Sequence, residues 1–288
     1  MSHFQVSRRN LLQKASIVAA GAAFMPVGAM GESDVKSSGV KGRIKQSASK
    51  WCYGKISLGD LCSAGAKMGL VGLDLLGPDA FSTLKQHGLV CTMTSGAGNI
   101  IDPAKHDNGV ERINAAIEAN AAAGFRNVIV TAGNRKDIPD DEVGKANAIM
   151  FLKRVAGLAE KKNVFICMEN LNSKVNHKGY MFDRMAWGVD VLKKVGSSHI
   201  KILYDIYHAQ IMEGDIIRTI QTHKDIIGHY HTGGNPGRNE IDETQEIYYP
   251  AIMHAIIETG YDGYVAHEFI PKRDPLTSLA QAVKLCDV

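Results

Sequence analysis

Short apolar runs alternate with longer helical segments over most of the chain, and this alternation restricts the fold more than any other feature. One helical segment, residues 108–124, spaces Val110, Ile113 and Ile117 along one face. Continuous apolar strands, each followed by a helix, are typical of a parallel sheet covered by helices. Eight strands are predicted, at residues 50–53, 71–76, 89–94, 127–131, 164–169, 200–205, 226–231 and 263–268.

Eight strand–helix units in about 240 residues predict an α/β fold, a (β/α)8 TIM barrel. The competing architecture is a doubly wound open sheet, which usually has a glycine-rich phosphate loop after its first strand. Residues 94–99, TSGAGN, contain only a fragment of such a loop, and the chain has neither GxGxxG nor GxxxxGKS/T. We therefore expect the barrel, and we assign it to residues 48–288.

The first 29 residues differ from the rest of the chain. They carry Arg8, Arg9 and Lys14 but no acid. After these basic residues, and still within the first 29, comes a short apolar run that ends in small residues. This order is typical of a secretory signal peptide, and the run is too short to span a membrane permanently. The arginine pair resembles the twin-arginine export signal, which predicts a periplasmic or otherwise exported protein without a stable membrane anchor. Residues 30–47 are polar and are expected to form a flexible linker.

The composition limits the class of partner. Without residues 1–29 the chain has 30 basic and 30 acidic residues, so the basic surface typical of nucleic-acid binding is not expected. The five cysteines are odd in number and form no CxxC pair, which argues against a disulfide framework or a zinc knuckle. The expected partner is a small-molecule substrate, and the sequence leaves a homo-oligomer open.

Four successive predicted strands end in an ionisable residue: Glu169, Asp205, His231 and Glu268. The C-terminal ends of barrel strands converge on the face that carries the active site, so these side chains should meet there. Any one of them alone is more often a paired or structural group, but repetition at four equivalent positions indicates a site. Three carboxylates and one imidazole suit Mn²⁺ or Mg²⁺, with Co²⁺ or Zn²⁺ as alternatives.

Two further histidines lie beside these positions. His229 and His231 point to the same side of their strand, because side chains alternate, so His229 is expected one layer deeper in the barrel. By the same alternation His267, which directly precedes Glu268, should point outward.

The segments MENLN, YDIYHAQIMEG, GGNPGRNE and HEFIP resemble the hydroxypyruvate isomerase family, within the xylose isomerase-like barrels that include ketose 3-epimerases. The resemblance covers roughly residues 50–288. It implies that Glu169, Asp205, His231 and Glu268 hold one divalent metal ion and that the two glutamates transfer the proton. It also implies that His208 and Arg238 bind substrate oxygens. Family members can carry glutamine where His231 stands, whereas the epimerases carry histidine, so the substrate stays open.

These groups suggest an isomerase that works through an enediolate. A metal ion that chelates a carbonyl and the neighbouring hydroxyl oxygen makes the intervening C–H more acidic. One glutamate removes the proton, and the other returns a proton to the adjacent carbon (isomerisation) or to the same carbon from the other face (epimerisation). Hydroxypyruvate isomerase-like activity is the first expectation. A ketose 3-epimerase, an AP-endonuclease-like phosphodiesterase and a non-catalytic sugar-binding protein are the alternatives.

Overall fold

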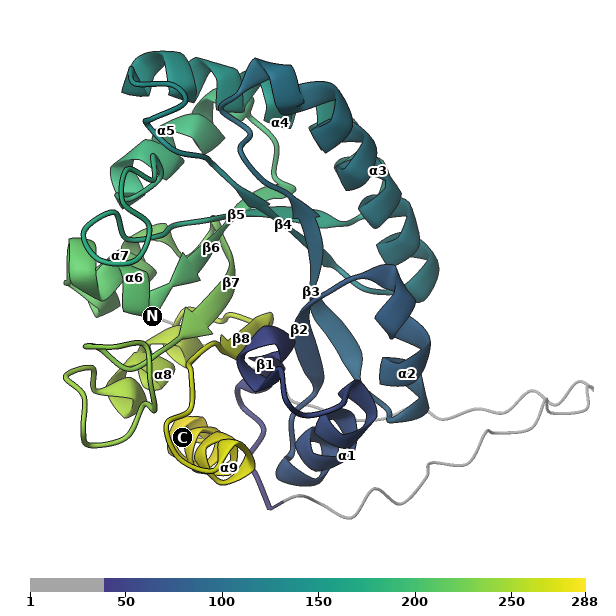
Figure 1. The fold of residues 1–288 in the computed structure, drawn as a ribbon, viewed down its shortest axis with the longest axis vertical. Helices are drawn as coiled ribbons and strands as arrows, with labels where there is room; N and C mark the ends of the chain where they lie inside the picture. The colour runs from purple at the N-terminus through teal and green to yellow at the C-terminus, as the bar shows by residue number, and fades with distance from the viewer. Residues whose placement is uncertain (1–38) are drawn as a thin grey trace, which may run out of the picture. The chain divides into compact units, whose positions relative to one another are not determined.

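Eight parallel strands close into a barrel in the order β1 to β8, and helices surround it (Figure 1). The computed structural model describes residues 39–288, so the predicted signal peptide and half of the predicted linker, residues 30–38, lie outside the described residues. The predicted TIM barrel is confirmed. Among residues 39–288, no helix is both long and apolar enough to cross a membrane.

The strands of the barrel are short and mostly buried. Each pairs in parallel with its sequence neighbours, and β1 pairs with β8 to close the barrel. Their bounds are β1 Lys45–Ser49, β2 Gly72–Leu76, β3 Val90–Ala97, β4 Asn127–Thr131, β5 Phe165–Glu169, β6 Ile200–Asp205, β7 Ile227–Thr232 and β8 Tyr264–His267.

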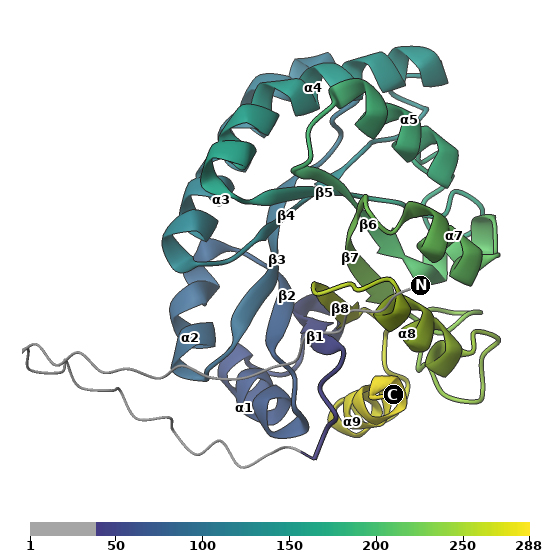
Figure 2. The ribbon, with the colours of Figure 1, turned by 180° about the vertical axis from the view of Figure 1, so that it is seen from behind.

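The helices form the outer layer of the barrel, as both views show (Figures 1 and 2). Glycines in the left-handed conformation end two of the helices: Gly124, at φ 78°, follows α3, and Gly196, at φ 77°, follows α5. The helices are η1 Lys50–Tyr53, α1 Leu58–Met68, η2 Pro78–Ala80, α2 Phe81–Gln86, η3 Pro103–Lys105, α3 His106–Ala123, α4 Asp141–Lys162, α5 Met185–Val195, α6 Ile206–Met212, α7 Ile216–His223, α8 Tyr249–Glu258 and α9 Pro275–Cys286.

The first predicted strand is wrong. Residues 50–53 form the short 3-10 helix η1, and β1 lies at 45–49, partly inside the segment assigned to the linker. The strand escapes a search for apolar runs because three of its four buried residues are polar. Gln46 donates to the carbonyl oxygen of Val283 in α9, and the Ser47 hydroxyl lies 2.9 Å from the hydroxyl of Thr92.

Side-chain alternation divides the strands between two cores. Odd-numbered residues such as Cys167 and Leu203 pack inside the barrel with Met93, while even-numbered residues such as Ile166 and Ile202 pack beneath the helices. The C-terminal strand ends continue the inner face, because Glu169 and Asp205 lie two residues beyond Cys167 and Leu203. Apolar side chains therefore lie directly below these two carboxylates.

Candidate active site

The structure brings the four predicted ligand residues together at the C-terminal ends of adjacent strands. Glu169 ends β5, Asp205 ends β6, His231 is the penultimate residue of β7, and Glu268 directly follows β8. One ligand atom from each lies within 4.8 Å of the others, and all four residues are buried. We call these residues the four-residue cluster; their role as ligands stays a prediction.

The imidazole of His231 stands at the centre of the cluster. Its Nδ1 lies 2.9 Å from Glu268 Oε2, 3.2 Å from Glu169 Oε1 and 3.9 Å from Asp205 Oδ2. Burial alone would lower the pKa of His231, but the charge of Glu268 and hydrogen bonds to carboxylates raise the pKa well above its ordinary value. The site therefore places three carboxylates around Nδ1 of His231, in a region that solvent barely reaches.

The three carboxylates differ in their electrostatic environment. Burial raises the pKa of Glu169, against the opposing effect of His231. Burial also raises the pKa of Asp205 to about 7, although the charge of Arg238 opposes this. For Glu268 the charges of His231 and Arg238 outweigh the effect of burial, so its pKa is lowered. Three buried acids this close together need a compensating positive charge.

A divalent cation fits the atoms that the cluster leaves unsatisfied. Glu169 Oε1, Asp205 Oδ2 and His231 Nδ1 are buried and have no hydrogen-bond partner among the described residues. Burying such atoms without partners is costly, and these three belong to one group of potential ligands. Three carboxylate oxygens and one imidazole nitrogen form a donor set suited to Mn²⁺, Mg²⁺ or a similar ion.

The remaining polar atoms of two cluster residues are held by the fold. Asp205 Oδ1 accepts a hydrogen bond from the backbone N–H of His208 at 3.0 Å and thereby caps α6, which leaves Oδ2 free. His231 Nε2 lies 2.7 Å from Oδ2 of Asp74, which leaves Nδ1 free. In each case one side-chain atom is fixed while the other points into the cluster.

Sequence reasoning missed Asp74. This residue lies in β2, is fully buried, and contacts both His229 and His231. An acid in the middle of the apolar run GLDLL was the available signal. His229 lies one layer below His231, as expected, and His267 points outward, where Gln46 and Thr232 bind its two ring nitrogens.

His208 lies beside the cluster and is fully buried. Its Nδ1 accepts the backbone N–H of Asn172 at 3.1 Å. Its Nε2 lies 3.6 Å from Asp205 Oδ2 and has no hydrogen-bond partner in the described part of the chain. Its ring packs edge-on against His177, which lines the cleft above the cluster. The predicted contact of His208 with substrate stays a prediction.

Arg238 reaches the cluster from the loop after β7, and its backbone is left-handed at φ 57°. Its Nη2 lies 2.5 Å from Glu268 Oε2 and 3.7 Å from Asp205 Oδ2. The guanidinium lies over the rings of Trp51 and Tyr207, 5.2 and 5.8 Å from their centroids. Its buried Nε has no hydrogen-bond partner within residues 39–288, so a donor remains for a ligand.

A cleft of about 610 Å³ opens above the cluster. Glu169, Glu268 and Arg238 form part of its lining, and Trp51 of η1 donates its indole N–H to Glu268 Oε1 at 2.6 Å. The opposite wall comes from the end of β4 and from the loops after β3 and β4. Sequence reasoning missed these residues because isolated polar residues carry no periodic signal; they are Asn99, Thr131, Asn134, Lys136 and Asp137.

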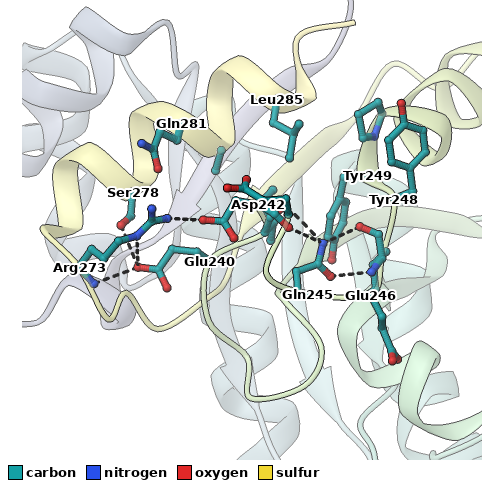
Figure 3. A pocket seen from close by; sticks show the side chains of 15 residues that line it. Glu240, Asp242, Gln245, Glu246, Tyr248, Tyr249, Arg273, Ser278, Gln281 and Leu285 are labelled. Carbon is teal, nitrogen blue, oxygen red and sulfur yellow. Dashed lines mark hydrogen bonds and ion pairs between the residues drawn. The ribbon is translucent and has the colours of Figure 1, made fainter.

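A second cavity, of about 510 Å³, lies between the loop at 240–250 and α9 (Figure 3). None of the predicted site residues lines it. Glu240, at its edge, accepts hydrogen bonds from the backbone of Lys272 and Arg273 and from the Ser278 hydroxyl. Arg273 also pairs with Glu240 and Asp242, so these charges already have partners, and the cleft above the four-residue cluster is the better candidate for chemistry.

Comparison with known proteins finds the same class of fold and several relatives that are named as isomerases. The family model described as a xylose isomerase-like TIM barrel matches residues 81–286. The chain is 30% identical to the 2-oxo-tetronate isomerase of Cupriavidus necator over 56% of this chain and 61% of that protein. It is 28% identical to the hydroxypyruvate isomerase of Escherichia coli over 59% of this chain and 65% of that protein. The alignments thus span less than two thirds of either relative.

Among solved structures, the 3-keto-D-glucoside 4-epimerase of Escherichia coli superimposes with a TM-score of 0.74. The match covers 84% of this chain and 98% of that one at 19% identity. At this identity the likeness concerns the fold alone.

Proposed function

The chain belongs to the xylose isomerase-like TIM barrel family, and we propose that it is a divalent-metal-dependent isomerase of a small hydroxy-carbonyl compound such as hydroxypyruvate. One observation carries the proposal: three buried ligand atoms that have no hydrogen-bond partner among residues 39–288 belong to one cluster at the floor of an open cleft. The names of the relatives, hydroxypyruvate isomerase and 2-oxo-tetronate isomerase, support the same reaction class.

Glu169, Asp205, His231 and Glu268 would hold the metal. When bound, the ion supplies Lewis acidity that polarises the carbonyl of the substrate and stabilises negative charge on its oxygens. Glu169 and Glu268 come from β5 and from the end of β8, so they reach the floor of the cleft from separate strands. This separation lets one carboxylate remove a proton from carbon while the other returns one.

The surroundings of Glu268 prepare it to act as the base. Its two oxygens are held by Trp51 Nε1 and Arg238 Nη2, and its lowered pKa keeps it ionised. A carboxylate in such an ion pair is a weak base. When a substrate oxygen takes over the Arg238 donor, Glu268 loses part of this stabilisation and becomes more basic. Burial raises the pKa of Glu169, which suits the opposite role of proton donor.

A ketose 3-epimerase is the second candidate, and the size of the cleft favours it. Hydroxypyruvate has about seven non-hydrogen atoms. Even if each atom is given the ~30 Å³ that one molecule occupies in liquid water, the compound fills only roughly 200 Å³. The cleft measures about 610 Å³, and its far wall offers amide, hydroxyl and charged groups that suit a longer hydroxylated chain.

Solvent-deuterium incorporation tests the proposal. The full chain, treated with a chelator and then reloaded with Mn²⁺, Mg²⁺ or Co²⁺, is incubated in D₂O with hydroxypyruvate, ketoses and oxidised sugars. We expect metal-dependent deuterium incorporation at a carbon next to the carbonyl, with an aldehyde product for an isomerase or an epimer for an epimerase. If no compound exchanges and the purified protein binds no metal, the proposal is wrong and a binding protein is favoured.

The cellular location belongs to the proposal as well. We propose export through the twin-arginine pathway on the basis of Arg8 and Arg9, which lie outside the described residues. Such a location would suit an extracytoplasmic sugar derivative better than a central metabolite.

A further inference from the structure

A second group of buried ionisable side chains lies directly beneath the four-residue cluster. Asp74 of β2 places its Oδ2 3.1 Å from His229 Nε2 and 2.7 Å from His231 Nε2, and all three residues are inaccessible to solvent. Strand β2 pairs with β1 and β3, whereas β7 pairs with β6 and β8. The contact therefore crosses the interior of the barrel and joins its two halves.

The carboxylate of Asp74 is fully engaged. Its Oδ1 accepts the one hydrogen of the Thr92 hydroxyl at 3.0 Å, and the same Thr92 oxygen lies 2.9 Å from the Ser47 hydroxyl and 3.2 Å from the carbonyl oxygen of Leu73. With two imidazoles on Oδ2, three donors compensate one buried charge, which a buried carboxylate requires. The proposed proton transfer does not itself require these buried polar groups below the floor of the cleft, so they call for a separate explanation.

This arrangement decides where His231 carries its proton. An ionised carboxylate can only accept hydrogen bonds, so the nitrogen that faces Asp74 must bear the hydrogen. In the neutral imidazole that a metal ion would bind, the other nitrogen then has the lone pair. That nitrogen is Nδ1, which faces Glu169 Oε1 at 3.2 Å and Glu268 Oε2 at 2.9 Å.

We propose that Asp74 is the positioning residue of His231: it fixes the ring and the Nε2–H tautomer that present Nδ1 as a ligand. This inference rests on the proposed function, since it concerns the same metal. A carboxylate that orients a metal-bound histidine typically changes metal affinity 10- to 100-fold when it is removed. The catalytic carboxylates come from β5 and β8, so Asp74 acts through His231 and without contact to the substrate.

The test compares Asp74→Asn with Thr92→Val in the full chain. Asp74→Asn keeps the shape but removes the charge that holds the Nε2–H form. Thr92→Val removes a buried hydrogen bond to the same carboxylate and leaves both imidazole contacts intact. Mn²⁺ affinity is measured by calorimetric titration, and the melting temperature of each metal-free variant reports its fold. We expect a 10- to 100-fold loss of Mn²⁺ affinity for Asp74→Asn and less than a threefold change for Thr92→Val.

A measurement on the unmutated chain covers the case in which Asp74→Asn does not fold. With ¹⁵N-labelled histidine and Mg²⁺ bound, NMR should show a hydrogen-bonded proton on Nε2 of His231, assigned by its loss in His231→Gln. Absence of that proton, or Mn²⁺ affinity in Asp74→Asn within threefold of the unmutated chain, overturns the positioning role. If the unmutated chain itself binds no Mn²⁺, the proposed function fails instead.

Discussion

The two halves of the barrel end their strands differently. The strands β5 to β8 deliver Glu169, Asp205, His231 and Glu268 to one point. The strands β1 to β4 end in residues that do not ionise near neutral pH, namely Ser49, Leu76, Ala97 and Thr131. The backbone repeats the same strand–helix unit around the barrel, but of the described strands only those of the second half carry ionisable side chains at or beside their C-terminal ends.

The first half contributes support instead. It supplies Asp74 beneath His231, Trp51 beside Glu268, and the loop residues Asn99 and Lys136 of the far wall of the cleft. The comparison indicates that reactive groups gather on one side of such a barrel, while the other side orients them and shapes the space for the substrate. Three predictions examine this division, from the largest effect to the smallest.

Carboxylates from the two halves should differ most in their effect on proton exchange. Glu268→Gln removes a proposed base and should slow deuterium incorporation by about 10³-fold, within the range for a lost general base. Asp137→Asn removes a carboxylate from the first-half wall of the same cleft, where Asp137 accepts from Asn99. That variant should stay within a few-fold of the unmutated chain. Unchanged exchange in Glu268→Gln would eliminate the two-glutamate scheme.

Asp205→Asn should separate metal binding from stability. Asparagine keeps the cap of α6 but removes the negative charge of a proposed ligand. Mn²⁺ affinity should therefore fall by about 10²-fold. The metal-free variant should nevertheless be more stable than the unmutated chain at pH 7, because an acid with a raised pKa opposes folding when ionised. Melting temperatures with Mn²⁺ and with a chelator provide the measurement.

The pH dependence of that difference follows from the sign of the shift. Burial raises the pKa of Asp205 from an ordinary value of about 3.9 to about 7 in the folded chain. The contribution of Asp205 to the free energy of unfolding is complete below pH ~4 and is lost as the pH rises through 7. Across the roughly three pH units between the two pKa values, the loss reaches about 4 kcal/mol. The advantage of Asp205→Asn should thus vanish near pH 4. An advantage that is equally large at pH 4 would contradict this explanation.

Trp51→Phe should have the smallest effect of the three. It removes the indole N–H that binds Glu268 Oε1 at 2.6 Å, and a hydrogen bond to a charged group is worth ~1.5–3 kcal/mol. We expect kcat/KM to fall by about tenfold. Trp187→Phe is the matched control, because the buried indole N–H of Trp187 has no partner in the described chain. Equal losses in both variants would show that Trp51 acts through packing alone.

Much of the fold was readable from the sequence because the signals were local. The β4 and β6 ranges were predicted with their observed bounds, since each is an apolar run between turn residues. The β1 range was missed because Gln46, Ser47 and Ser49 are buried polar residues whose partners lie far along the chain. A buried polar strand gives no hydropathy signal, and only its tertiary hydrogen bonds explain why it is tolerated.

The candidate site divides in the same way. The convergence of Glu169, Asp205, His231 and Glu268 could be predicted because position at a strand end is a local property and the barrel brings strand ends together. Asp74 could not be paired with His231 in advance, since 157 residues separate them and the contact crosses the barrel interior. The engagement of Arg238 by Glu268 likewise depends on a loop conformation that no periodicity specifies.

The sequence by itself determined the class of fold, the face that carries the chemistry and the four side chains that meet there, because strand period and strand ends are encoded locally. Tertiary structure alone decided which atom of each side chain is free, which nitrogen of His231 faces the carboxylates, and how much space lies above them. Those properties arise from contacts between distant segments inside a closed barrel, where burial makes each unpaired atom costly and each orientation specific.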